Sequence, residues 1–496
     1  MPYICAIDQG TSSSRAMLFD GDLNIIASHQ VAINAYYPNP GWVEQDPQEI
    51  LDSVITVIRE TLREAKLEAK DVLAFAITNQ RETTIVWDRA TGKAVYPAIV
   101  WQSRQSAFYC EDLKQKGFEP FIKKRTGLVI DSYFSASKIR FILDEIEDGQ
   151  KRADAGELAF GTVDTWLVHH LSKGKDFVTD VSNASRTLLM NIEKCAWDPK
   201  LLDIWNIPLN MLPNIVDTSG LLAECDASWF GHAIPIAALV GDQQAALFGQ
   251  LCLEAGDVKN TYGTGCFLLM NTGEKKIESK NGLLTTIAWR RNGKLNYALE
   301  GSVFVAGAAI QWLRDGLHFI ESSSECEAKA LSVPSSEGVV VVPAFVGLGA
   351  PYWQSDAKGA IFGLTRGTTD AHIVRATLES LALQTYDVVQ AMQEDSLIKL
   401  TKLQVDGGAS KNDYLMQYQA GILGVDVIRP VISETTALGA YLLAGLAMGM
   451  FKDEQELMAK WRSEKTFKPN MIKTEQNDIL EQWKHAIKAV LKFNDL

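Results

Sequence analysis

A turn near the start of the chain carries residue types that bind phosphate groups. In the segment DQGTSSSR (8–15), a carboxylate ends an apolar strand, a glycine permits a tight turn, hydroxyl residues follow, and Arg15 lies on the returning strand. Turn amides, hydroxyls and one arginine can together hold phosphates, and Asp8 can face a magnesium ion. The same residues are typical of an ordinary surface hairpin, and the segment alone favours that interpretation.

Two glycine-rich segments of the second half could hold a nucleotide. The turn YGTG (262–265) lets a ligand approach the backbone closely. The segment DGGASKN (406–412) follows an apolar strand and opens into a helix, whose N-terminal amides and dipole attract phosphate, and it is the strongest single nucleotide signal. Gly307 and Gln311 lie one helical turn apart, which leaves room beside a hydrogen-bonding amide, although ordinary helix packing is the simpler interpretation of this pair alone.

Charged residues that follow two apolar strands could take part in acid–base chemistry. Asp242 in GDQQAALFGQ (241–250) lies between the strand PIAALVG and a helix, where a carboxylate can serve as a general base. Aspartate is also a common N-cap, and capping bonds would keep this carboxylate ionised at some cost in basicity. Arg81 and Glu82 in NQRETT (79–84) follow another strand, and taken alone such a pair indicates a solvated loop.

Strands and helices alternate around these residues, and the pattern restarts near the middle of the chain. The restart gives strand, Gly-Thr turn and strand at 257–273, a ribbon at 283–300 and a helix from Ala306. It predicts an α/β protein with two similar domains, residues 1–250 and 251–496. In the first half the expected elements are strands at 3–8, 15–20 and 24–33, a helix from Asp46 and Pro47, and a strand at 72–78.

Composition excludes several classes of protein. Hydrophobic residues make up 47% and charged residues 22% of the 496 residues, as in an ordinary folded protein. The formal charge of -13 argues against nucleic acid, which needs a basic face. The seven scattered cysteines form no metal-binding pair and are expected to be reduced and buried. The segment 436–451 is too short and glycine-rich for a membrane span, so we expect a buried, tightly packed helix there.

Taken together and in order, short segments along the chain closely resemble the glycerol kinase family. The resemblance runs from about residue 3 to about residue 450, and many motifs in the right order are far more specific than any one of them. It implies an α/β fold of two actin-like (ribonuclease-H-like) domains around a central cleft. The segments are DQGTSSSR (8–15), GWVEQDP (41–47), NQRETT (79–84), IVWQSR (99–104), YFSASK (133–138), TDVSNASRT (179–187), GDQQAALFGQ (241–250), YGTGCF (262–267), GAIFGLTRG (359–367) and VDGGASKND (405–413).

The resemblance also implies an activity and the residues that perform it. It implies the transfer of a phosphoryl group from ATP to glycerol, with Asp242 as the general base and Mg²⁺ met by Asp8 through water. Polar residues must set the specificity for a small triol, while aromatic residues exclude water. The implied glycerol-binding residues are Arg81, Glu82, Trp101, Tyr133, Asp242, Gln243 and Phe267. The implied nucleotide-binding residues are Thr11, Ser12, Ser13, Arg15, Thr264, Gly307, Gln311, Gly408 and Asn412.

The departures from the family pattern concern regulation. Some bacterial members carry a phosphorylated histidine in a His-Phe-Tyr-Gly segment, whereas this chain has SWFG (228–231), with Ser228 in that place. His232 is out of register with that histidine. Other members have a glycine-rich loop for fructose bisphosphate, which is missing between Gly231 and Ile234. We therefore expect neither form of regulation. The C-terminal 45 or so residues match no motif.

Two alternatives remain at the sequence level. One is a related kinase that acts on a pentulose, a sugar acid or erythritol, although Arg81, Glu82, Trp101 and Tyr133 favour glycerol. The other is a non-catalytic ATP-binding switch of the actin or chaperone kind, because a fold does not fix a function. The family resemblance further implies a homo-oligomer, a dimer or tetramer, and residues 1–20 lack a signal peptide, so a cytoplasmic location is expected.

Overall fold

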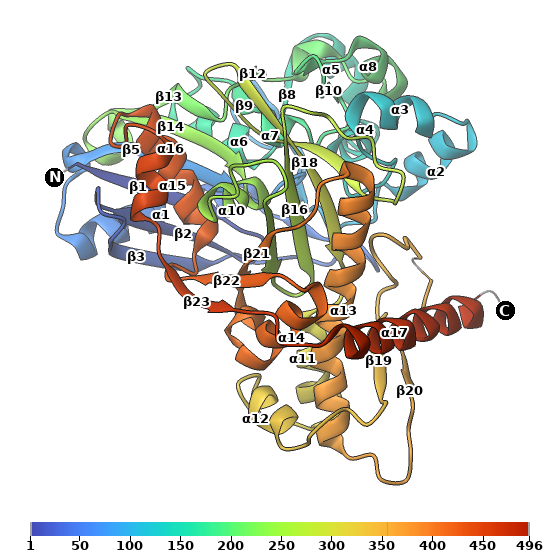
Figure 1. The fold of residues 1–496 in the computed structure, drawn as a ribbon. Coiled ribbons are helices and arrows are strands. Elements are labelled where there is room, and N and C mark those ends of the chain that lie inside the picture. Colours follow the sequence, from blue (N-terminus) through green and yellow to red (C-terminus); the bar gives the residue numbers. More distant parts are fainter. Residues whose placement is uncertain (1, 355, 495–496) are drawn as a thin grey trace.

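One large mixed sheet organises the protein, which a computed structural model describes for residues 2–354 and 356–494 (Figure 1). Within these residues the sheet has 13 strands, in the order β23-β22-β21-β15-β16-β18-β17-β13-β14-β5-β1-β2-β3. Its strands are β1 (Tyr3–Gln9), β2 (Ser13–Phe19), β3 (Ile25–Ala32), β5 (Val72–Asn79), β13 (Ser219–Cys225), β14 (Ile234–Gly241), β15 (Val258–Tyr262), β16 (Cys266–Gly273), β17 (Leu284–Arg291), β18 (Lys294–Val303), β21 (Lys402–Gly407), β22 (Asp426–Pro430) and β23 (Ser463–Phe467).

The two halves of the sheet repeat one strand order. In the first half the order is β3-β2-β1-β5-β14, and in the second it is β18-β16-β15-β21-β22. In each half the first three strands form an antiparallel ribbon, and the remaining two run parallel to the first strand. This repeat confirms the expected α/β class and the restart of the pattern in the second half.

Helices link the strands in corresponding places of the two halves. Helix α1 (Pro47–Ala65) connects β3 to β5, and its N-cap Asp46 accepts a hydrogen bond from the backbone N–H of Gln48 at 2.8 Å, as the sequence predicts. Helix α13 (Asp370–Ser396) makes the equivalent connection from the β17–β18 ribbon to β21, and α14 (Asp413–Leu423) links β21 to β22. The crossover helices therefore fix the parallel strands, whose carboxyl ends carry the candidate residues.

The helices that follow the fifth strand of each half pack directly against each other. These are α10 (Asp242–Gly249) and α15 (Thr435–Ala447), which both carry glycine at the contact. A Cβ atom at Gly439 would lie 1.8 Å from the carbonyl oxygen of Ala245, so only glycine allows this approach. Buried apolar residues of α10, α15 and the strands around them form one cluster that joins the halves. The expectation of a buried helix near 436–451 is confirmed, and no helix in the described residues is long and apolar enough to cross a membrane.

A long insertion between β5 and β13 covers one end of the molecule with short helices, drawn in cyan and green in Figure 1. Its apolar side chains form a cluster of their own. The described elements of the insertion are β6 (Ile85–Asp88), β7 (Ala98–Ile99), α2 (Ala107–Gln115), α3 (Glu119–Thr126), α4 (Ser135–Glu145), α5 (Gly149–Asp154), β8 (Leu158–Gly161), α6 (Val163–Leu171), β9 (Val178–Asp180), α7 (Val181–Ala184), β10 (Met190–Asn191), β11 (Ala196–Trp197), α8 (Pro199–Trp205) and β12 (Asn214–Val216).

The C-terminal segment, which the sequence left unassigned, ties the two halves together. After α15 come α16 (Glu454–Lys460), β23 at the edge of the sheet and α17 (Lys473–Asn494). Trp461 donates from Nε1 to the carbonyl of Gly249 at 3.2 Å, and Lys460 donates to the carbonyl of Gly21 at 2.9 Å. Trp483 on α17 donates to Asp387 of α13 at 2.7 Å. The segment therefore contacts the first half as well as the second.

All seven cysteines lie in the described part of the chain and are free, and six of them are buried, as expected. The exception is Cys195, which is partly exposed. Burial raises the pKa of the Cys5 thiol to about 12, and burial also raises that of the Cys110 thiol, to about 11. Such thiols are poor nucleophiles, which is consistent with a packing role.

Candidate active site

The register of the parallel strands brings distant segments to one edge of the sheet. Gln9 at the end of β1 pairs with Asn79 of β5, and Asn79 pairs with Gly241 of β14. The segments that follow these strands therefore meet, although about 230 residues separate the first from the last. In the second half Tyr262 pairs with Gly407, so the turn 263–265 lies beside the segment 408–412. Ligand sites of open α/β sheets form at such carboxyl ends.

Asp242 is the first residue of α10, and its carboxylate faces Arg81. Its Oδ1 lies 3.2 Å from the Arg81 Nε and accepts the backbone N–H of Gln243 at 2.7 Å. The expectation that Asp242 caps the helix is wrong, because the N-cap position is occupied by Gly241. With 29% of its side chain exposed, Asp242 is the accessible carboxylate of a cluster whose other carboxylates are buried.

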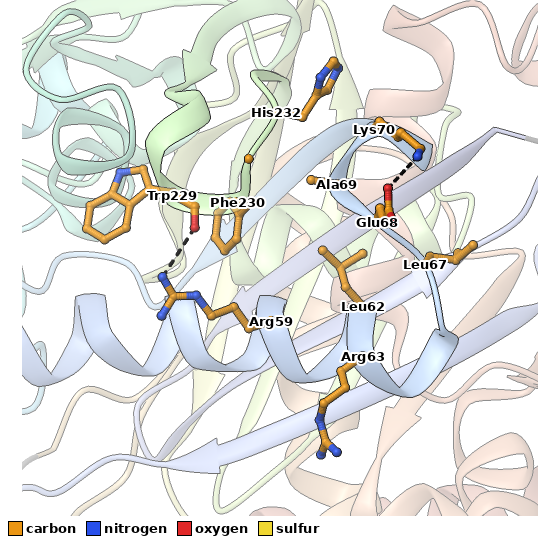
Figure 2. A pocket seen from close by; sticks show the side chains of 11 residues that line it. Arg59, Leu62, Arg63, Leu67, Glu68, Ala69, Lys70, Trp229, Phe230 and His232 are labelled. Atoms are coloured by element: carbon orange, nitrogen blue, oxygen red, sulfur yellow. Dashed lines mark hydrogen bonds and ion pairs between the residues drawn. The ribbon is translucent and has the colours of Figure 1, made fainter.

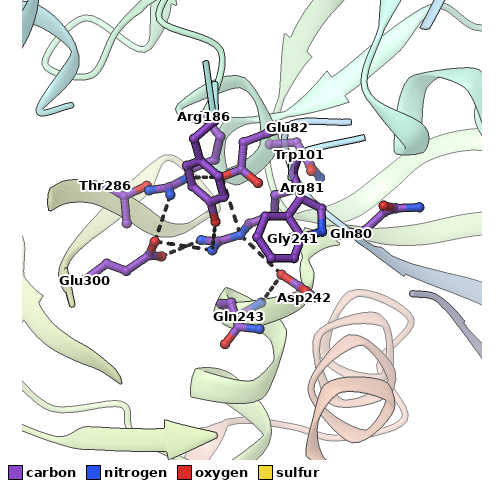
Figure 3. A network of polar contacts seen from close by, with 12 residues as sticks. Gln80, Arg81, Glu82, Trp101, Arg186, Gly241, Asp242, Gln243, Thr286 and Glu300 are labelled. Atoms are coloured by element: carbon purple, nitrogen blue, oxygen red, sulfur yellow. Dashed lines mark hydrogen bonds and ion pairs between the residues drawn. The ribbon is translucent and has the colours of Figure 1, made fainter. Parts of the chain in front are cut away.

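Arg81 and Glu82 are buried, not solvated. Two further residues complete a closed ring of charges with them, Arg186 and Glu300 (Figure 3). The Nη1 of Arg81 lies 2.5 Å from Glu300, Arg186 bridges to the other oxygen of Glu300 at 2.8 Å, and Arg186 also binds Glu82 at 2.6 Å. Two guanidinium groups thus balance two carboxylates, the arrangement that makes buried charges tolerable.

The pKa values of the two ring carboxylates differ. Burial alone would raise the pKa of Glu300, but Arg186 and Arg81 lower it to about 2. Burial raises the pKa of Glu82 despite its pair with Arg186. Glu82 also has a φ of 61°, a left-handed conformation that is costly for a side chain with a Cβ and that clusters at functional sites.

Arg186 and Glu300 were not predicted as site residues. Arg186 lies in the segment TDVSNASRT, whose resemblance to the family does not by itself imply a role for this residue. That segment is fixed against the end of β5, because the side-chain amides of Asn183 and Asn79 pair at 3.0 and 3.1 Å. Glu300 lies in the middle of β18, next to apolar residues. A charged residue inside an apolar stretch is the feature of the sequence that could have indicated a site residue.

Three aromatic residues from separate segments meet beside Asp242. The rings of Trp101 and Tyr133 pack edge to face with centroids 5.5 Å apart, and Trp101 and Phe267 do so at 6.3 Å. Trp101 donates from Nε1 to Oγ1 of Thr11 at 2.9 Å, which links this wall to the first turn. The Tyr133 hydroxyl accepts from Arg81 at 3.4 Å. The expected glycerol-binding residues thus form one group with an apolar wall and a polar face.

The two glycines of the expected nucleotide site, Gly307 and Gly408, have different surroundings. Gly307 at the start of α11 (Gly307–Gln311) donates its N–H to the carbonyl of Gly263 at 3.0 Å, and a Cβ atom there would lie 2.6 Å from that oxygen. The turn with Thr264 therefore packs onto the helix with Gln311. A Cβ atom at Gly408 would meet nothing within 4 Å, which leaves open space at this position.

Asn412 is the N-cap of α14, where its Oδ1 accepts the backbone N–H of Leu415 at 2.9 Å. This bond uses the amide oxygen and leaves the amide nitrogen as the group that could bind a ligand. The pairing of β15 with β21 brings Gly408 and Asn412 beside the 263–265 turn. These second-half residues form a second group at the same edge of the sheet.

Arg15 and Ser13 are engaged by other side chains. Arg15 forms an ion pair with Glu434 at 2.5 Å and donates to Gln30, which in turn donates to Ser13 at 2.7 Å. Ser12 is exposed. A phosphate group at Arg15 would have to share the guanidinium with Glu434 or displace it.

Asp8 lies near Asp242. Burial raises the pKa of Asp8 to about 7, and the negative charges of Asp242 and Glu434 add to this, while Arg15 opposes it. Two neighbouring carboxylates fit a hydrated Mg²⁺, which keeps several waters and binds one or two carboxylates. In the described residues no group of three or more His, Cys, Asp or Glu side chains could hold a metal ion directly.

A separate cavity of about 620 Å³ lies between α1, residues 67–70 and residues 229–232 (Figure 2). Arg59 and Arg63 project from α1, and Lys70 lies in the segment that follows α1. Arg59 donates to the carbonyl of Trp229 at 3.4 Å. Its lining contains none of the expected glycerol or nucleotide residues. The SWFG segment (228–231) that departs from the family pattern overlaps α9 (Ala227–Phe230), and its residues Trp229, Phe230 and Gly231 line this cavity.

Comparison with known proteins shows the family of the chain and then identifies some of its relatives. Models of the N-terminal and C-terminal domains of the FGGY family of carbohydrate kinases match residues 3–249 and 258–448. The chain belongs to the FGGY family of carbohydrate kinases. It is 55% identical to a glycerol kinase of Bacillus subtilis over 492 residues, covering 99% of both chains, and 55% identical to glycerol kinase 2 of Thermotoga maritima over 491 residues, again covering 99% of both.

Solved structures agree with this assignment. A crystal structure of Plasmodium falciparum glycerol kinase with ADP superposes with a TM-score of 0.94 at 36% sequence identity, covering 99% of this chain and 98% of that one. A gluconate kinase from Lactobacillus acidophilus superposes with a TM-score of 0.89 at 21% identity over the same shares. The second match supports the fold alone. The expected fold of two actin-like domains is confirmed, and the resemblance to glycerol kinases holds over the full length.

Proposed function

We propose that the protein transfers the terminal phosphoryl group of ATP to glycerol and so forms sn-glycerol 3-phosphate. The observation that carries this proposal is the position of Asp242. Its carboxylate is accessible, touches Arg81, and lies beside the wall of Trp101, Tyr133 and Phe267. The identity of 55% to glycerol kinases over the full chain supports the same substrate.

The chemistry follows from the weakness of an alcohol as a nucleophile. Asp242 would accept the proton of the terminal hydroxyl of glycerol while the oxygen of that hydroxyl forms its bond to the γ-phosphorus of ATP. The bond between this phosphorus and the oxygen that bridges to the β-phosphate breaks, and ADP leaves with that oxygen. Arg81 and Gln243 would hold the hydroxyl groups, and the three aromatic rings would exclude water.

The nucleotide would lie between the second-half residues of the expected nucleotide site and the turn at residues 10–13. Thr264, Gly307 and Gln311 would contact it on one side, with Gly408 and Asn412 beside them, and Thr11, Ser12, Ser13 and Arg15 would meet the phosphates. Asp8 would hold Mg²⁺ through water, and this ion supplies charge neutralisation at the phosphates when it is bound. The open space at Gly408 is the geometric support for a ligand there.

A substrate panel tests the proposal. With ATP and Mg²⁺ present, ADP formation should depend on glycerol and be far slower with xylulose, gluconate or erythritol. ADP formation that is equal with and without any polyol would support the switch alternative, and a preference for a sugar would identify a related kinase.

The quaternary structure and the location in the cell are further parts of this proposal. We infer a homo-oligomer, which light scattering on the purified protein would test, and a cytoplasmic location.

The domain boundary near residue 250 also stays a prediction, and limited proteolysis around residues 250–257 would test it.

A further inference from the structure

Lys259 is a buried lysine beside the glycerol-binding residues, and the proposed mechanism gives it no task. It lies on β15 with a fully buried side chain. Its Nζ donates to Oε1 of Gln243 at 2.5 Å, to Oγ1 of Thr261 at 2.9 Å and to the carbonyl oxygen of Phe267 at 3.1 Å. An ammonium group has three donors, so all of them are used.

Two of these partners are expected glycerol-binding residues from different elements. Gln243 is the second residue of α10, beside Asp242 (Figure 3), and Phe267 lies on β16. Lys259 and Thr261 are two residues apart on one strand and therefore share a face. The lysine thus joins a first-half helix to two second-half strands directly behind the site.

The chemistry of the ammonium group fixes the orientation of the Gln243 amide. A lysine ammonium donates hydrogen bonds and accepts none, so the amide oxygen must face it. The amide nitrogen of Gln243 must then point the other way, and the partial exposure of this side chain leaves that nitrogen free for a ligand. Without Lys259 nothing would fix this orientation, and the amide could rotate so that its oxygen faces the ligand.

We propose that Lys259 is a positioning residue that binds the Gln243 amide oxygen and thereby aims the amide nitrogen at a hydroxyl oxygen of the substrate. This inference rests on the proposed function, because the hydroxyl belongs to glycerol. Lys259 itself does not touch the substrate. It converts a side chain that could donate or accept into a dedicated donor.

A double-mutant cycle tests this role in the full chain. Lys259→Met removes the three donors at similar length, and Gln243→Ala removes the amide. Each should raise the KM for glycerol about tenfold, as expected for the loss of one hydrogen bond, and leave the KM for ATP within about twofold. Because both changes remove the same interaction, the double variant should also show about a tenfold increase and not about a hundredfold one.

Thr261→Val is the matched control. It removes one hydrogen bond from the same ammonium group but leaves its bond to Gln243, so the KM for glycerol should not change. An additive double variant, or a normal KM for glycerol in Lys259→Met, would overturn the positioning role.

Gln243→Glu tests the same idea without a change at the buried lysine. The carboxylate pairs well with Lys259, so the protein should fold, but it offers no donor to glycerol and the KM for glycerol should rise. An unchanged KM would show that the amide nitrogen is not the group that matters. The wild-type assay separates this result from the proposed function: no turnover of glycerol would refute the function, whereas turnover with an additive cycle would refute only the role of Lys259.

Discussion

A substitution of Asp242 can separate an effect on catalysis from an effect on helix stability. Because Gly241 occupies the N-cap, Asp242→Asn leaves the cap intact, and the asparagine oxygen can still accept the N–H of Gln243. The amide cannot take the proton of a hydroxyl, so kcat should fall roughly 10²- to 10⁴-fold. ATP affinity and Tm should change little. A folded Asn variant with near-normal turnover would show that another group is the base.

Arg81 has two tasks, because it belongs to the ring of buried charges and also faces Asp242. Arg81→Ala should raise the KM for glycerol at saturating ATP and also cost roughly 3–5 kcal/mol of unfolding free energy, since Glu300 keeps only one of its two partners. Denaturant unfolding and steady-state kinetics measure the two effects separately. Wild-type stability would contradict the charge-balance argument, and an unchanged KM would remove Arg81 from the glycerol site.

Glu300 shows what the sequence could and could not predict. The implied ligands Arg81 and Asp242 follow predicted strands, and their convergence follows once these parallel strands end at one edge. Glu300 and Lys259 lie inside strands, where no local pattern shows which face or which neighbour a side chain meets. That information comes from the register of β15, β16 and β18.

At the scale of elements, the alternation of apolar residues predicted the strands of both ribbons and α1 close to their true bounds. The pattern could not show that α10 and α15 pack together, because their glycines lie about 190 residues apart in sequence. It also missed that the last segment, from α16 to α17, extends the sheet and contacts the first half. Long-range packing of this kind leaves no periodic signal.

The α10–α15 contact can be tested by adding one methyl group. Gly439→Ala would place a Cβ atom 1.8 Å from the carbonyl oxygen of Ala245, so the two helices must separate. We expect a loss of roughly 1–3 kcal/mol of stability, typical of overpacking, visible as a lower Tm in a thermal scan. Gly21→Ala is the control, because a Cβ atom there meets nothing within 4 Å. Equal Tm values in the two variants would show that the helices adjust without cost.

At the scale of the whole molecule, most expected glycerol residues come from the first half, whereas the nucleotide residues come largely from the second. Contacts that already join the halves at the glycerol site include Lys259 to Gln243, Glu300 to both Arg81 and Arg186, and Phe267 to Trp101. In the described part of the chain, no hydrogen bond or ion pair joins residues 307–311 or 408–412 to the first half.

Ligand binding should therefore close the molecule from the nucleotide side, because the γ-phosphorus must come in line with the hydroxyl oxygen before transfer. In small-angle X-ray scattering, glycerol together with Mg²⁺ and a non-hydrolysable ATP analogue should give a smaller radius of gyration than the protein alone. Glycerol alone should change the curve little, since its contacts across the halves are already formed. A decrease in the radius of gyration with glycerol alone would mean that the glycerol site itself drives closure. Identical scattering curves in all states would mean that the two halves are already close enough for phosphoryl transfer without ligands.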